Sequence, residues 1–179
     1  DGVCFHLPGL HQLNQIEDYT SRSVHFAGGR VEASVPFSKS FTIQFWLWSG
    51  IINENEPINN HIAEINGLNL NLTNTQKSFQ FKLINKFRRL DIDGIEPRCW
   101  NLVTLVANPN SCEIWVNDVH HFDFKRHIIT SDNVKEMRLV FGGDSDGKAD
   151  FHGKLDEITF YDRQLTSKEI INLYKSSNP

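Results

Sequence analysis

Three carboxylates stand close together in one glycine-containing segment, which runs from Asp144 to Asp150. Hard cations such as calcium take carboxylate and carbonyl oxygens as ligands, and a turn lets alternate residues converge on one point. Asp144, Asp146 and Asp150 therefore define a hypothetical calcium site. The alternative is a solvated turn, because Asp and Gly are ordinary turn residues and Lys148 places a positive charge among the carboxylates.

Two short basic segments offer anion-binding side chains. Clustered ammonium and guanidinium groups suit sulfated or acidic glycans, because they make charge-assisted hydrogen bonds to sulfate and carboxylate oxygens. The alternative is a charged strand edge that prevents pairing with another sheet. The residues concerned are Lys86, Arg88, Arg89, Lys125 and Arg126.

A neutral sugar needs an exposed indole beside amide side chains. Trp48 ends an aromatic-rich segment just before a loop rich in Asn and Glu. We predict that Trp48 forms a ligand site with Asn53 and Asn55 of that loop. The other tryptophans lie inside predicted strands and are interpreted as packing residues, namely Trp46, Trp100 and Trp115.

The acidic and nucleophilic residues do not suggest catalysis. Asp156 and Glu157 are adjacent, so on a strand they face opposite sides of the sheet and cannot act on one bond. We interpret Asp156 as a partner of backbone groups near a helix. The Ser and His residues form no nucleophile-elbow or metalloprotease motif, and the pair His120-His121 lacks metal-ligand spacing. We therefore predict that the protein is not an enzyme.

The composition narrows the class of partner. With 18 basic and 22 acidic side chains the net charge is −4, so no overall positive field would draw the chain to nucleic acid. The longest apolar stretches fall far short of the ~20 residues of a membrane helix, and we expect no membrane insertion. The 13 Phe and 4 Trp against 1 Met favour sheets whose faces are filled by rings.

The cysteines and one glycosylation motif bear on the compartment. Three cysteines cannot all pair within one chain. If Cys112 lies opposite Ala107 in a hairpin, Cys99 is roughly 26 Å further along, which disfavours a Cys99–Cys112 disulfide. A Cys4–Cys99 disulfide and three thiols both remain open. Asn71 begins an Asn-Leu-Thr glycosylation acceptor, which favours an extracellular location slightly, and the odd number of cysteines opposes it.

Alternating and aromatic-rich segments predict an all-β domain. Segments 24–26 and 31–35 flank a Gly-Gly turn and are predicted to form a hairpin. Segment 41–48 is predicted to be a central strand, covered on both faces at one end. Segments 100–106 and 113–116 flank an Asn-Pro-Asn-Ser turn and predict a second hairpin. The other predicted strands are 61–65, 68–72, 79–84, 88–92, 136–141 and 153–161.

One helix closes the predicted domain. Thr166 and Glu169 form a T-x-x-E capping box, and the apolar residues Ile170, Ile171 and Tyr174 follow at helical spacing. The strands are about 8–12 residues apart, which is typical of a sandwich rather than of βαβ units. No internal repeat or linker marks a domain boundary.

These segments, in this order, resemble the laminin-G-like, pentraxin-like and concanavalin-A-like family. The resemblance covers residues 22–176 and is carried by Phe-Ala-Gly-Gly at 26–29, Phe-Thr-Ile-Gln-Phe-Trp at 41–46, the 100–117 hairpin and, above all, the block 139–174. It implies a jelly-roll sandwich of two antiparallel sheets with a short C-terminal helix. In the hairpin that follows, Asn117 would begin a tight turn, and Asp118 stands where the family usually has Gly, a residue that also tolerates left-handed backbone.

The resemblance also bears on chemistry. Relatives that hydrolyse polysaccharides carry Glu-x-Asp-x-x-Glu on one strand, and that spacing does not occur in this sequence. Laminin-G-like and pentraxin-like modules often bind calcium in a rim loop, which adds to the calcium hypothesis above.

We therefore predict an N-terminal extension, residues 1–21, that packs on a laminin-G-like jelly-roll domain, residues 22–176. The expected function is a non-catalytic binding module within a larger, extracellular or cell-surface protein. It would recognise a glycan or protein ligand through rim loops at 49–60, 118–133 and 143–151, and a toxin or viral receptor-binding part would be a special case. The main alternative is a scaffold or interaction domain with no glycan site, cytosolic or extracellular. A glycoside-cleaving enzyme is the least favoured of these function classes.

Overall fold

The computed structural model describes ten stretches of the chain, and these form strands and one helix. The described residues are 3–7, 23–49, 59–65, 68–75, 78–84, 88–92, 95, 98–125, 135–147 and 151–176. The elements in chain order are β1 (Val3–Leu7), β2 (Val24–Ala27), β3 (Val31–Pro36), β4 (Phe41–Ser49), β5 (Asn59–Ile65), β6 (Leu68–Thr75), β7 (Ser78–Ile84), β8 (Arg88–Ile92), β9 (Trp100–Ala107), β10 (Ser111–Val116), β11 (Val119–Lys125), β12 (Glu136–Phe141), β13 (His152–Tyr161) and α1 (Ser167–Ser176).

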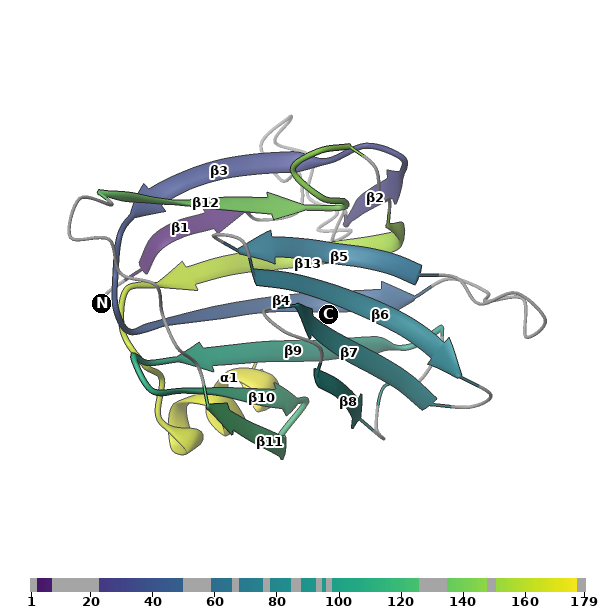
Figure 1. The fold of residues 1–179 in the computed structure, drawn as a ribbon. Helices are drawn as coiled ribbons and strands as arrows, with labels where there is room; N and C mark the ends of the chain where they lie inside the picture. Colours follow the sequence, from purple (N-terminus) through teal and green to yellow (C-terminus); the bar gives the residue numbers. More distant parts are fainter. Residues whose placement is uncertain are drawn as a thin grey trace, which may run out of the picture.

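The strands form two antiparallel sheets that lie face to face (Figure 1). Sheet A has the order β1-β13-β4-β9-β10-β11, and β2 also pairs with β13. Sheet B has the order β3-β12-β5-β6-β7-β8. Neighbours such as β13 and β4 are far apart in the sequence, as a jelly roll requires. The predicted sandwich is confirmed.

The core lies between the two sheets and is filled by alternate residues of the strands. Phe45 of sheet A meets Phe141 of sheet B, with ring centroids 5.9 Å apart and planes at 73°. Each fully buried large apolar side chain contributes about 1.5–3 kcal/mol to folding, so this layer dominates stability. Strand β4 contributes four side chains that are 0% exposed, namely Phe41, Ile43, Phe45 and Leu47.

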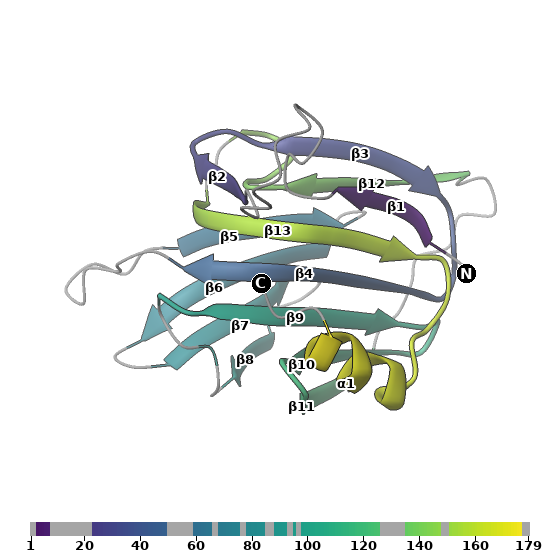
Figure 2. The same cartoon turned by 180° about the vertical axis from the view of Figure 1, so that it is seen from behind.

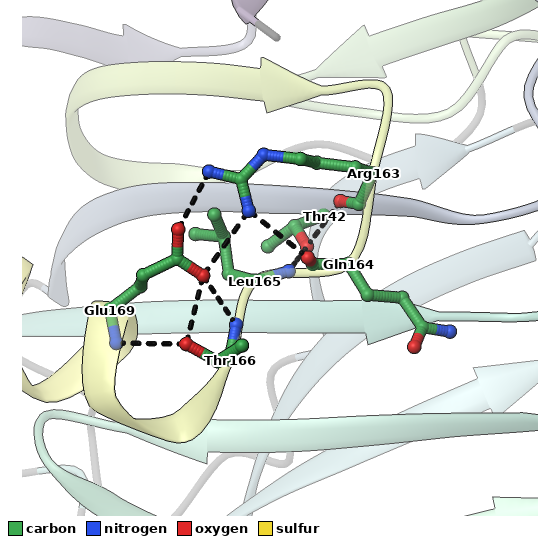
Figure 3. A network of polar contacts seen from close by, with 6 residues as sticks. All are labelled: Thr42, Arg163, Gln164, Leu165, Thr166 and Glu169. Atoms are coloured by element: carbon green, nitrogen blue, oxygen red, sulfur yellow. Dashed lines mark hydrogen bonds and ion pairs between the residues drawn. The ribbon is translucent and has the colours of Figure 1, made fainter. Parts of the chain in front are cut away.

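Helix α1 begins at the predicted capping box, which is confirmed (Figure 3). The backbone N–H of Thr166 donates to Glu169 Oε2 at 2.8 Å, and the N–H of Glu169 donates to Thr166 Oγ1 at 3.3 Å. Arg163 donates to both oxygens of Glu169, at 2.7 and 3.2 Å. This side-chain hydrogen bond, followed by those from Thr166, lowers the pKa of Glu169 to about 2.

The helix covers one end of the outer face of sheet A, as Figure 2 shows. Its buried residue Ile170 packs in a small apolar cluster with Val106, Trp115 and Leu165. The ring of Tyr174 lies against that of Trp46, with centroids 6.0 Å apart.

The predicted hairpin of segments 24–26 and 31–35 is wrong. Strand β2 pairs with β13 in sheet A, whereas β3 pairs with β12 in sheet B. The segment between them therefore crosses from one layer to the other, with Gly28 at φ 90. Phe26 is drawn into the core against Phe151, with ring centroids 6.1 Å apart. Alternation predicts a strand but does not identify the strand with which it pairs.

Strand β4 is central, as predicted, and its outer face is covered from Thr42 to Trp46, over more of the strand than the one end predicted. Thr42, at the start of the strand, is buried, donates to the carbonyl of Arg163 at 2.9 Å and accepts from the N–H of Leu165 at 2.9 Å. Trp48, near the other end, is only half-buried. The segment that leads into the helix satisfies the polar groups at the covered end.

The hairpin of β9 and β10 is confirmed, and it continues into a further strand within the predicted rim loop 118–133. Residues Val119–Lys125 form β11, which pairs with β10. The left-handed residue of the intervening turn is Asn117, at φ 58, whereas Asp118 is not among the described residues with positive φ. Asn117 is held by Leu102, whose N–H donates to Asn117 Oδ1 at 2.9 Å and whose carbonyl accepts from the Asn117 N–H at 2.7 Å.

The cysteine geometry follows the predicted register. Cys112 lies opposite Ala107 and is buried, whereas Cys99 is exposed, and these two cysteines do not form a disulfide with each other. The N-terminal strand β1, which contains Cys4, pairs with β13. Among the described residues, no helix has the length and apolar character needed to cross a bilayer.

Candidate functional site

The first candidate is the turn that follows β12, where Asp144 and Asp146 lie. Glu64 of β5 holds this turn, because its Oε2 accepts from the N–H of Ser145 at 2.9 Å. Arg30 holds it from the other side, since its Nη1 donates to the carbonyl oxygen of Asp144 at 3.2 Å. The turn itself is closed by the N–H of Gly147, which donates to the same carbonyl at 3.3 Å.

A chain of alternating charges surrounds this turn. Glu32 accepts from Arg30 Nε at 2.9 Å and from Arg138 Nη2 at 2.7 Å. The hydrogen bond from Arg138 is the main reason why the pKa of Glu32 is lowered. The pKa of Arg138 is raised, first by the hydrogen bond to Glu32 and more weakly by the charges of Glu64 and Asp146. These groups are exposed to water, so they contribute little to stability.

This arrangement only partly suits a calcium ion. A guanidinium already engages the Asp144 carbonyl, one of the oxygens that calcium would use. In the part of the chain that the structure describes, no group of three or more His, Cys, Asp or Glu side chains could hold a metal. The third predicted ligand, Asp150, lies outside the described residues. Calcium at Asp144, Asp146 and Asp150 therefore stays a prediction.

The predicted basic residues fall on edge strands. Arg88 and Arg89 belong to β8, the last strand of sheet B, and Lys125 belongs to β11, the last strand of sheet A. Figures 1 and 2 show both strands along the same side of the sandwich. Lys86 and Arg126 lie outside the described residues. An edge position agrees with the interpretation of these charges as protection against sheet-to-sheet pairing.

The second candidate surrounds Trp48. This residue pairs with Lys154 of β13 on one side and with Trp100 of β9 on the other. The Lys154 ammonium lies over the Trp48 ring, with Nζ 5.1 Å from the ring centroid. The neighbours Leu47 and Leu155 are in the core, so these three side chains stand on the outer face of sheet A.

The tryptophans therefore divide into two pairs. Trp46 and Trp115 are 1% and 7% exposed, which confirms them as packing residues. Trp100 is half-buried beside Trp48, so it is less enclosed than the other two tryptophans predicted to be packing residues. Strand alternation places Trp100 on the outer face, and nothing local indicates which part of that face the helix covers. Asn53 and Asn55, the predicted partners of Trp48, lie outside the described residues.

The adjacent carboxylates Asp156 and Glu157 lie at an irregularity in strand β13. Asp156 is 3% exposed, and its Oδ1 accepts from the N–H of Glu157 at 2.8 Å. Glu157 adopts φ 49 at an irregularity in the pairing of β13 with β4. A buried carboxylate bonded to its own bulge stabilises that bulge. It agrees with the prediction that Asp156 serves backbone groups.

Comparison with known proteins identifies the family to which this fold is similar. Residues 23–171 match the family described as the concanavalin A-like lectin/glucanases superfamily. A search of curated protein sequences found no match.

Among solved structures, the receptor binding domain of botulinum neurotoxin C/D mosaic serotype is similar at a TM-score of 0.67 and 15% identity, over 98% of this chain and 51% of that one. The ligand binding domain of botulinum neurotoxin serotype D in complex with N-acetylneuraminic acid is similar at 0.60 and 16%, over 97% and 46%. The binding domain of Paraclostridial Mosquitocidal Protein 1 gives 0.58 and 14%, over 97% and 47%. At these identities the likeness concerns the fold, and the chain spans about half the length of each structure.

Proposed function

This chain belongs to the concanavalin A-like lectin/glucanase superfamily, and we propose that it is a non-catalytic module that binds a glycan. The similar structures are receptor-binding and ligand-binding domains, and one of them was solved with a sugar. Those proteins are about twice as long as this chain, so their ligands serve as a guide to the class of function only.

The observation that carries this proposal is the pair Trp48 and Trp100. The two residues lie opposite each other on β4 and β9, and both are half-buried rather than enclosed. Indole rings at a surface offer flat apolar faces beside a polar N–H group, a combination suited to the C–H faces and hydroxyl groups of a sugar. The rest of the outer face described for sheet A lacks this pairing, because Trp46 and Trp115 are buried.

We place the protein outside the cell or on its surface, as part of a larger multidomain chain. The Asn-Leu-Thr acceptor at Asn71 supports this location. Asn71 lies within β6, at a register position between His61 of β5 and Lys82 of β7. Glycopeptide mass spectrometry of the protein purified from its own source tests the location, and an unmodified Asn71 removes this support.

A glycan array followed by calorimetric titration of the strongest sugars tests the function. We expect binding that Trp100→Ala weakens, with the intrinsic tryptophan fluorescence of the wild-type protein changing on titration. Val119→Ala is the matched control, because Val119 is a 52% exposed apolar residue on a different part of the sandwich. If the protein binds no sugar on the array and captures a protein partner instead, the scaffold alternative is favoured.

A further inference from the structure

Four residues from four strands form a continuous row on the outer face of sheet A. His25 pairs with Lys154, Lys154 pairs with Trp48, and Trp48 pairs with Trp100. Side chains directly opposite each other in an antiparallel sheet stand about 4.5–5.5 Å apart at Cβ, so these four are neighbours in order. We call them the Trp48 row.

The row occupies the end of sheet A away from the helix. Figure 2 shows α1 over one end of β9 and β10, whereas Trp48, Trp100 and Lys154 lie at the opposite ends of β4, β9 and β13. The adjacent residue of β4 on this face, Trp46, is covered by Tyr174. Along β4, therefore, the covered part of the face ends between Trp46 and Trp48.

Lys154 is held in a defined position within the row. Its Nζ lies 5.1 Å from the centroid of the Trp48 ring, where the negative face of the indole attracts an ammonium. An ammonium has three N–H donors, and contact with a ring face leaves donors available for an anionic ligand. Because the Lys154 side chain is half-buried, less water screens its charge than at a fully exposed site.

Two further residues bring basic groups to the row, one as a member and one as a neighbour. His25 is exposed beside Lys154. Arg98 is also exposed, and its backbone N–H donates at 3.2 Å to the carbonyl of Ser49, the residue that follows Trp48. The carboxylate of Asp156, two residues along β13 from Lys154, is buried and bonded to the backbone of Glu157. Among the described residues, Lys154, His25 and Arg98 thus bring three basic groups together in a chain of net charge −4.

We propose that the Trp48 row binds an acidic saccharide. Lys154 donates to the carboxylate or sulfate of the sugar, Trp100 stacks on its apolar face, and Trp48 positions the Lys154 ammonium. The proposal deepens the glycan-binding function and rests on it. Charge complementarity favours an acidic sugar over a neutral one, because the anion of an acidic sugar would supply a counter-charge to the half-buried Lys154 ammonium.

Matched pairs of sugars test the proposal by calorimetric titration. The carboxylate pair is 3′-sialyllactose against lactose, and the sulfate pair is 6-sulfo-N-acetyllactosamine against N-acetyllactosamine. We expect at least one acidic member to bind about tenfold tighter than its neutral partner, as a charge-assisted hydrogen bond allows. The pair that shows the difference identifies which anion the site takes.

Variants assign the three roles. Lys154→Gln should bring the acidic member to the affinity of its neutral partner, whereas Lys39→Gln, an exposed lysine just before the other end of β4, should change nothing. Trp100→Ala should weaken both members about fivefold, as expected for loss of one ring contact, with Trp100→Phe restoring most of it. Trp48→Leu should lower the preference for the acidic member, and Trp48→Phe should retain it, because only the aromatic ring attracts the ammonium.

The outcomes distinguish a failure of the acidic-saccharide inference from a failure of the proposed glycan-binding function. Equal affinity for acidic and neutral members, or an acidic preference that survives Lys154→Gln, overturns the inference and leaves glycan binding standing. If no sugar binds on the array or in titration, both the acidic-saccharide inference and the proposed glycan-binding function are overturned. Thermal unfolding of each variant verifies that a loss of binding is measured on folded protein.

Discussion

The ring of Phe26 lies against the α-carbon of Gly142, at the place that a Cβ on residue 142 would occupy. The same Cβ would stand 2.7 Å from the carbonyl oxygen of Gly29. Gly142 has φ 90, its N–H donates to the carbonyl of Ile62 at 2.8 Å, and its carbonyl accepts from the N–H of Phe151 at 3.0 Å. This glycine therefore joins β2, β5 and the start of β13 where the chain leaves β12.

Gly142→Ala should destabilise the domain by about 3 kcal/mol, because a left-handed backbone strains an alanine and the Phe26 ring must move. Urea unfolding measures the change. Gly29→Ala is the matched control, since a Cβ there has nothing within 4 Å; it should stay within about 0.5 kcal/mol of the wild type. Equal stability of the two variants would contradict the packing of Phe26 on Gly142.

Thr166→Ala should cost about 1 kcal/mol, because the helix loses its capping hydroxyl. The hydroxyl donates to Glu169 Oε2 at 2.9 Å and accepts from the Glu169 N–H at 3.3 Å. Thermal unfolding provides the measurement, with Ser167→Ala, an exposed hydroxyl in the first turn, as the control. The cap would be unimportant if both variants melted together.

The stability difference between wild type and Glu169→Gln should depend on pH. The hydrogen bonds from Arg163 and then from Thr166 lower the folded pKa of Glu169 from 4.5 to about 2. A depressed folded pKa means that the carboxylate stabilises the fold above pH 4.5 and that this contribution is lost as the pH falls toward 2. The difference in Tm should therefore be present at neutral pH and shrink across that window. A difference that stays constant through it would argue against the ionised Glu169.

Cys99 and Cys112 should differ in their reaction with a thiol reagent. Cys99 is exposed, and Cys112 is 0% exposed in the core. In native buffer a maleimide should label Cys99 within minutes and should reach Cys112 only in denaturant. Peptide mapping by mass spectrometry distinguishes the two from Cys4. Rapid native labelling of Cys112 would mean that the β9–β10 layer opens readily.

Calcium at Asp144, Asp146 and Asp150 predicts a heat of binding and a rise in Tm. Rim-loop sites of extracellular modules bind calcium with a Kd of about 0.1–1 mM. Calcium at tenfold that Kd should stabilise the fold by about 1.4 kcal/mol. The variant Asp144→Asn/Asp146→Asn should lose both effects, and Asp162→Asn, an exposed carboxylate elsewhere, should keep them. If millimolar calcium produces neither a heat of binding nor a shift in Tm, the calcium hypothesis is removed.

Sequence reasoning succeeded where the partners lie close together in the chain. The hairpin of β9 and β10 joins residues 100–116 across one short turn, and even the pairing of Cys112 with Ala107 was predictable. The capping box joins Thr166 to Glu169 within one helical turn. In both cases local hydrogen bonding decides the geometry, and no distant segment competes.

Prediction from the sequence failed where a strand has several possible partners that lie far away in the chain. Segments 24–26 and 31–35 have the alternation of a hairpin, yet β13 and β12 take them into different sheets. Residues 119–125, with the polar side chains of His120, His121 and Asp123, predict a loop, yet pairing with β10 makes this segment a strand. These outcomes depend on contacts that no local pattern encodes.

By itself the sequence determined the class of fold, because alternation, turn residues and the cap act over a few neighbouring residues. It also indicated Trp48 as a surface aromatic. Only the tertiary structure decided that Lys154 lies over that ring and that Trp100 stands beside it. Residues 25, 48, 100 and 154 are distant in the chain, and three separate strand registers align them in one row. A slip of one residue in any of these registers would turn a member of the row to the other face of the sheet.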